Sequence, residues 1–169
     1  IRLSLVGSEM CIRDRNWTEQ LRSIVGLRHD RFEFDVKALK AARPSTLPDN
    51  SGRVNDSITT ASVSLIYALD SNHELYASLG NGFHSNDARG VLTTRDPFSG
   101  MQADSADPLV PTFGAELGWR IYFTDELNTT LALWQLDVDS ELLFVGDSGS
   151  TEDTGFGSER YGLELTAYY

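Results

Sequence analysis

The segment that decides the fold is Glu74–Gly90, ELYASLGNGFHSNDARG. Its first half alternates between two sets of side chains. The apolar set is Leu75, Ala77 and Leu79, and the small or hydroxyl-bearing set is Tyr76, Ser78, Gly80 and Gly82. A period of two places successive side chains on opposite faces of a β-strand. We therefore predict a strand with one greasy and one polar face, as in a wall between lipid and a water-filled lumen.

The same alternation recurs along most of the chain. The other predicted strands are 21–36, 58–69, 113–123, 129–145 and 160–169. Short connections fall at 70–73 and 124–127, and long ones fall at 38–57, 85–112 and 146–159. Long loops gathered at one end of an antiparallel up-and-down meander are typical of a transmembrane β-barrel. We predict an all-β fold of about six strands, forming part of a large barrel.

Charged side chains are predicted to face the lumen. The charged residues predicted there are Arg28, Asp30, Glu116, Arg120, Asp137, Asp139 and Glu164. The neutral residue Gln135 is predicted to face the lumen with them. A dry core would make such charges costly unless every one were paired, whereas a wet lumen removes most of the penalty. Outward positions are expected to hold the aromatic residues Tyr67, Trp119, Trp134, Tyr161 and Tyr169. In the segment 21–36 the pattern changes phase at Arg31–Phe32, which suggests a bulge or an extension beyond the membrane.

Composition excludes some classes of function. The net charge of −11 argues against a nucleic-acid partner, because phosphate binding needs a basic surface. No segment approaches the roughly 18 consecutive apolar residues of a membrane-spanning helix. Two alternatives stay open from the pattern alone: a passive porin or adhesin-type barrel, and a soluble β-sandwich binding module.

The first 15 residues, IRLSLVGSEMCIRDR, have no relation to the alternating strands after them. Met10–Arg15 resembles the translation of a transposon-end adapter used in sequencing libraries. We therefore exclude residues 1–15 from fold reasoning and treat 16–169 as the fragment of a barrel domain. Cys11 is the only cysteine, so this division leaves no disulfide or thiolate chemistry in the rest of the chain.

The best candidate for ligand contact is the run Ser85–Gly90, where a strand passes into the longest loop. Asn86, Asp87 and Arg89 combine an amide, a carboxylate and a guanidinium there. Arg89 could bind an anionic ligand group through two hydrogen bonds. The alternative, which we favour, is that Asp87 and Arg89 pair with each other and order the loop.

Neither catalytic nor metal-binding residues are identified. His73 and His84 are expected at opposite ends of the barrel, with His29 nearer His84, and a metal site needs ligands that converge. No GxSxG, P-loop or HExxH motif is present, and the chain is not predicted to be an enzyme. The acidic loop 146–159 lacks the spacing of an EF-hand, so a solvated loop is favoured over a calcium site.

Four segments in order resemble the β-barrel of TonB-dependent outer-membrane receptors. They are Glu74–Phe83, Glu116–Arg120, Leu131–Leu142 and Arg160–Leu165, similar to the family patterns LYASxGxGF, ExGxR, LALxxxDxDxEL and RYGxEL. The resemblance covers residues 17–169. It implies a Gram-negative outer-membrane barrel of about 22 strands with a plugged lumen.

The resemblance also implies what the complete protein would do. Uptake would be energised by a TonB–ExbB–ExbD complex acting through a plug domain that these residues do not include. The cargo would be a siderophore, cobalamin, another metal complex or a carbohydrate, and no cofactor is expected. Outer-membrane lipid would surround the wall.

Overall fold

One curved antiparallel sheet dominates the computed structural model, which describes residues 2–37, 49–96, 99–140, 142–145, 150–153 and 156–169. Its strands follow one another in chain order. They are β1 (Arg2–Asn16), β2 (Leu21–Val36), β3 (Gly52–Ala68), β4 (His73–Ser85), β5 (Leu109–Tyr122), β6 (Asn128–Val138) and β9 (Ser158–Tyr168). A short helix, α1 (Ala88–Leu92), and a separate hairpin of β7 (Leu142–Val145) and β8 (Ser150–Asp153) lie in the long connections.

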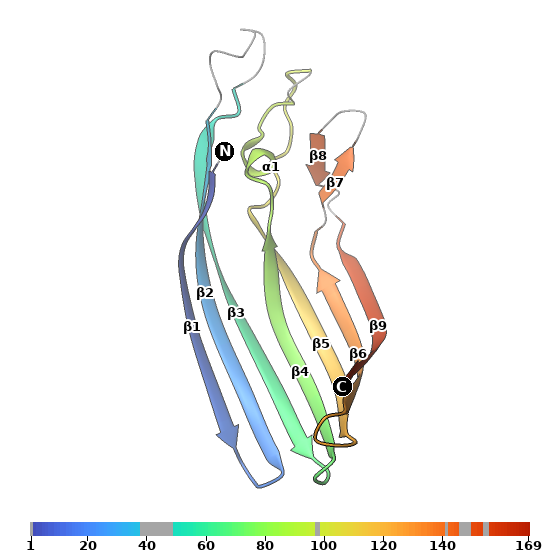
Figure 1. Ribbon diagram of the computed structural model, residues 1–169. Coiled ribbons are helices and arrows are strands. Elements are labelled where there is room, and N and C mark those ends of the chain that lie inside the picture. Colours follow the sequence, from blue (N-terminus) through green and yellow to red (C-terminus); the bar gives the residue numbers. More distant parts are fainter. Residues whose placement is uncertain (1, 38–48, 97–98, 141, 146–149, 154–155) are drawn as a thin grey trace.

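The connections alternate between short and long, as predicted. Residues 17–20, 69–72 and 123–127 form the short turns, which lie at the bottom of Figure 1. α1 and the β7–β8 hairpin, which belong to longer connections, lie at the top. The predicted antiparallel up-and-down meander is thereby confirmed.

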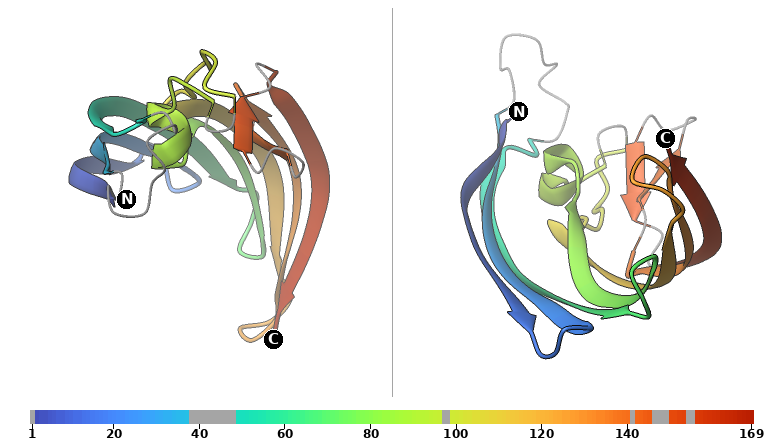
Figure 2. Two further views of the ribbon diagram at one scale, coloured as in Figure 1. Left: turned by 90° about the horizontal axis from the view of Figure 1, so that it is seen from above. Right: turned by 60° about the horizontal axis from the view of Figure 1, so that its bottom comes forward.

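The two faces of the sheet differ in chemistry because the side chains alternate. Figure 2 shows α1 inside the curve of the sheet, so the face that contacts it is the concave one. The convex face carries a band of leucines that are at least half exposed: Leu65, Leu79, Leu117, Leu133 and Leu163. A continuous exposed apolar surface of this kind indicates contact with lipid or another protein.

The strand boundaries depart from the sequence prediction in two places. β3 begins at Gly52, because its polar first residues pair with the upper half of β2. The segment predicted as one strand over 129–145 divides into β6, which ends at Val138, and the separate strand β7. The sheet has seven strands rather than six because Arg2–Asn16 also forms one.

No bulge occurs in β2 at the predicted phase change. Its register with β3 is continuous from Leu21 to Val36, and the irregularity lies across β1, between Leu5 and Gly7. The upper concave face of β2 is apolar for another reason. Phe34 is completely buried in a small cluster with Ala88, Val91 and Leu109, so α1 and the loop around it shield this part of the strand from water.

β1 places charged side chains on the convex face of the sheet. Residues paired directly across an antiparallel ladder share a face. Arg13 is paired with Val25 on the convex face, whereas Ile12 is paired with Gly26 on the concave face. Glu9 likewise lies on the convex side, opposite His29. At Arg13, β1 thus presents a charge where β2 presents an apolar side chain.

Candidate functional site on the concave wall

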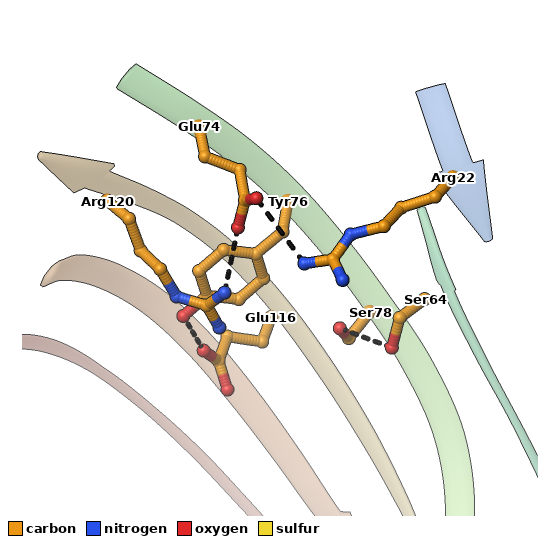
Figure 3. A network of polar contacts seen from close by, with 7 residues as sticks. All are labelled: Arg22, Ser64, Glu74, Tyr76, Ser78, Glu116 and Arg120. Atoms are coloured by element: carbon orange, nitrogen blue, oxygen red, sulfur yellow. Dashed lines mark hydrogen bonds and ion pairs between the residues drawn. The ribbon is translucent and has the colours of Figure 1, made fainter. Parts of the chain in front are cut away.

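A network of charged and polar side chains crosses the concave face near the short turns (Figure 3). Glu74 of β4 lies between two arginines. Arg120 Nη1 of β5 is 2.8 Å from Glu74 Oε1, and Arg22 Nη2 of β2 is 3.4 Å from Glu74 Oε2. Because Glu74 accepts from both neighbours, its carboxylate links three strands of the wall.

Tyr76 joins this network to a second carboxylate. Its hydroxyl donates a hydrogen bond to Glu116 Oε1, and the Arg120 guanidinium lies 4.7 Å from the centroid of its ring. The ring rests against Gly118, the residue directly opposite on β5, where a Cβ atom would overlap it. An aromatic ring laid over a glycine in the next strand helps to fix the register of the two strands.

The same arrangement recurs two strands along, where Trp134 of β6 covers Gly162 of β9. A Cβ atom at Gly162 would lie 2.7 Å from Trp134 Cζ2. Beside the Tyr76 ring lies a hollow of about 510 Å³, lined in part by Glu116, Arg120 and Glu164. The register places all three of these predicted lumenal residues on the concave face.

Asp137 is on the other face, contrary to the sequence expectation. It is paired with Phe113, which is 45% exposed on the convex side. Trp134, expected outside, is paired with Glu116 and faces inward. The prediction failed because Leu131, Ala132, Leu133 and Trp134 make both faces of β6 apolar, so hydropathy does not fix the phase of this strand.

At the upper rim, the residues of the predicted ligand site bind one another and the loop. Asn86 is buried, and its Nδ2 donates to the carbonyl of Asp107 at 2.7 Å. Asp87 caps α1 by accepting from the Arg89 amide at 2.8 Å. Arg89 Nε and Nη2 lie 2.9 and 3.0 Å from the two carboxylate oxygens of Asp87. These hydrogen bonds hold the pKa of Asp87 below its ordinary value.

The favoured pairing of Asp87 with Arg89 is therefore present, and it orders the start of the loop. Whether the same residues contact a ligand stays a prediction.

The three histidines lie apart from one another. His73 begins β4 and stacks near Trp119, whereas His84 lies at the other end of the strand. His29 Nδ1 is 2.8 Å from Thr59 Oγ1. Among the described residues, no three His, Cys, Asp or Glu side chains are grouped to hold a metal ion. Of the acidic loop, Asp147 and the side chains of Glu152 and Asp153 lie outside the described residues.

Two members of the network, Arg22 and Glu74, were not singled out from the sequence. A usable signal was present, because each lies second in a strand that follows a short turn. The short turns all lie at one end of the sheet, so residues close to them are expected at the same level of the wall. The described part of the chain contains no helix that is both long and apolar enough to cross a membrane.

Comparisons with known proteins agree on one family. Residues 14–169 match the family model described as TonB dependent receptor-like, beta-barrel. Members of this family are outer-membrane transport receptors of Gram-negative bacteria rather than enzymes. A search of curated proteins found no match.

Solved structures share the fold. The copper transporter OprC is 23% identical with a TM-score of 0.70, over 96% of this chain and 25% of its own. The ferric-catecholate import receptor Fiu from E. coli K12 is 13% identical with a TM-score of 0.64, over 95% of this chain and 24% of its own. The alcaligin outer-membrane receptor FauA from Bordetella pertussis is 19% identical with a TM-score of 0.61, over 95% of this chain and 26% of its own.

The chain thus spans about a quarter of each of these structures. The family match covers nearly all of the chain, and the sheet has the matching polarity, with charges on its concave wall and leucines outside. This chain belongs to the TonB-dependent receptor family, as a segment of its β-barrel domain.

Proposed function

We propose that the intact protein is an energised uptake receptor of the Gram-negative outer membrane. The observation that carries this proposal is the family match over residues 14–169. Energy would come from a TonB–ExbB–ExbD complex acting through a plug domain outside this segment. The cargo class is a scarce small ligand, and the structural neighbours named for copper, ferric-catecholate and alcaligin favour a metal complex over cobalamin or a carbohydrate.

The concave network suits the wall of a filled lumen. Arg120 donates a hydrogen bond to Glu74, and the Tyr76 hydroxyl donates one to Glu116. The Arg120 guanidinium lies over the Tyr76 ring and so connects the two pairs. Linked charges of this kind keep their orientation when an adjacent surface changes. Their role in the proposal is to give the plug domain a rigid, polar surface near the short turns.

Transport is tested with the complete gene, expressed in a strain that lacks its own receptors for iron complexes. Accumulation of radiolabelled iron complexes is measured with the tonB gene present and with it deleted. The proposal expects accumulation only when tonB is present. A passive porin would admit the same complexes at equal rates in both strains, and that result would overturn the proposal.

We also propose that the native barrel segment corresponds to residues 16–169 and that residues 1–15 are of foreign origin. Support comes from the charged residues Glu9 and Arg13 of β1, which lie on the convex face, and from the family match, which starts at residue 14. Sequencing source genomic DNA across this junction is the test. Finding the codons for 1–15 joined in frame to those for 16–169 would overturn the division.

A further inference from the structure

The described sheet contains a seam between β3 and β4 in its upper half. The pairing of these two strands ends at Ser62 and Gly80. Above this level β3 stays paired with β2 as far as Gly52, and β4 stays paired with β5 as far as Ser85. Along residues 52–61 of β3, the register therefore lacks the ladder that joins neighbouring strands elsewhere in the sheet. We call this line the β3–β4 seam.

Side chains take up backbone groups along the β3 edge of the seam. Asn81 Oδ1 accepts from the Ala61 amide at 2.7 Å, and Asn81 Nδ2 lies 3.4 Å from the Thr59 carbonyl. The Ser57 amide donates to Asp56 Oδ1 at 2.8 Å. Buried or paired backbone groups need such partners when a neighbouring strand does not supply them. Strand pairing across the seam would therefore have to displace these side chains.

α1 joins the two sides of the seam through an apolar cluster. The helix follows β4 in the chain, and Figure 2 shows it inside the curve of the sheet. Its buried residues Ala88 and Val91 pack in one cluster with Phe34 of β2 and Leu109 of β5. The residues of this cluster, its partly buried neighbours included, all lie between 32 and 109. The link between the two sides is therefore made without β1.

The far end of the segment 86–95 is fixed to the start of β3. Asn50 Nδ2 donates to the Arg95 carbonyl at 2.8 Å. Asn50 Oδ1 lies 3.3 Å from each of the Thr94 and Arg95 amides. Leu92 adds an apolar contact, because its Cδ2 lies 3.3 Å from the position of a Cβ at Gly52. One asparagine thus holds both amide groups and a carbonyl of the segment.

The near end of the same segment is fixed on the other side of the seam. The backbone amide of Asn86 donates to the Pro108 carbonyl at 3.0 Å, just before β5 begins. The Ala106 amide donates to the Gly90 carbonyl at 3.1 Å. Residues 86–95 therefore run from the β4–β5 side to the β2–β3 side and are anchored on both.

We propose that residues 86–95 form a strap that holds the two sides of the β3–β4 seam together and so sets the width of the upper end of the wall. Asn81 and the contact between Phe32 and Phe83, with ring centroids 5.6 Å apart, link the sides close to the point where pairing ends. The strap links them above that point. Regions with few ladder bonds open at lower free energy than paired strands. Release of the strap therefore parts the upper halves of β3 and β4 and leaves their lower halves paired.

The test measures distances between spin labels in the intact receptor, purified in detergent, by pulsed electron paramagnetic resonance. Ser57→Cys and His84→Cys place labels on exposed positions across the seam. Leu65→Cys and Leu117→Cys give a reference pair on β3 and β5, at a level where both strands are paired with β4. We expect Asn50→Ala to lengthen the seam distance by about 5 Å, one strand spacing, or more. The reference distance should not change.

Asn55→Ala is the matched control. Asn55 is also an exposed asparagine of the β3 segment, but it is paired with Glu33 on the convex face, away from the strap. This variant should keep the wild-type seam distance. Asn50→Ala/Val91→Ser is the second variant, because it also removes an apolar contact of α1, and it should widen the seam further. Heat-dependent migration in detergent gels shows whether each barrel is folded.

A wild-type seam distance in both the folded Asn50→Ala variant and the folded double variant would overturn the strap. Equal lengthening of the seam and reference distances would also overturn it, since the whole sheet would then have loosened. If the double variant does not fold, Asn50→Ala alone decides, because Asn50 precedes the first residue of β3. The proposal concerns the barrel wall and does not depend on the uptake function, which the tonB comparison tests separately.

Discussion

At the residue scale, glycines opposite aromatic rings shape the concave wall. Gly118 is directly under the Tyr76 ring, whereas Gly114 on the same face of β5 has no atom nearer than 3.9 Å to the position of a Cβ. The sequence predicted that Tyr76 and Gly80 share the polar face of β4. It did not predict the pairing of Tyr76 with Gly118, because that depends on register between strands rather than on alternation within one.

Gly118→Ala should destabilise the intact barrel by about 1–3 kcal/mol, because the new methyl group forces the Tyr76 ring out of its place. Loss of the hydrogen bond from Tyr76 to Glu116 is then expected as well. Urea unfolding in detergent, followed by tryptophan fluorescence, measures the change. Gly114→Ala is the control and should stay close to wild type. Equal stability of the two variants would contradict this account of the wall.

The ionisation of Asp87 is expected to make the stability of the rim loop depend on pH. Its pKa is lowered by the hydrogen bonds from Arg89. A lowered pKa stabilises the folded loop above the unfolded-state value of about 3.9, and the contribution is lost as the pH falls through the lower folded value. Hydrogen exchange of the α1 amides should therefore accelerate below about pH 4. In Asp87→Asn this acid step should be missing, and its persistence would assign the step to another group.

At the scale of elements, alternation predicts faces well wherever only one face of a strand is apolar. β4 and β5 meet this condition, and their convex residues Leu79 and Leu117 are exposed as expected. β6 does not meet it, so Trp134 and Asp137 were assigned to the wrong faces. α1 lay within a predicted loop, because a helix of five residues leaves no periodic signal and depends on packing against Phe34.

Single charged substitutions test whether the convex face of β5 contacts lipid. Leu117→Arg puts a charge on the proposed lipid surface and should cost about 2–4 kcal/mol if it lies near the bilayer midplane. Ser78→Arg places the same charge on the concave face of the adjacent strand, where water is available. The yield of folded receptor in outer membranes measures both. Equal yields would contradict the assignment of the two faces.

At the scale of the whole molecule, the sheet is an incomplete wall. β1 and β9 are the end strands of the sheet, each hydrogen-bonded to one neighbouring strand among the described residues. The leucine band on the convex side is exposed in the described part of the isolated chain. Open edges and exposed apolar surface promote association between chains. The antiparallel meander, the asymmetry of its loops and its family could be predicted from the sequence. The end of the pairing between β3 and β4 at Ser62 and Gly80 could not, because it depends on how separate strands pair.

Residues 16–169 expressed without detergent should aggregate and should refold only in the presence of detergent or lipid. Analytical ultracentrifugation of the refolded and detergent-free material measures this. A soluble monomer that unfolds cooperatively would instead support a β-sandwich and would contradict a membrane wall.

We propose that the convex face of this sheet lies in lipid and that the concave face lies against an aqueous lumen. The most direct measurement is spin-label accessibility along residues 75–80 of the intact receptor, with single cysteines introduced in turn. We predict that the ratio of oxygen to water-soluble nickel accessibility alternates with a period of two, high at Leu75, Ala77 and Leu79 and low at Tyr76, Ser78 and Gly80. A ratio that is uniform along the strand, or that alternates in the opposite phase, would contradict the claim.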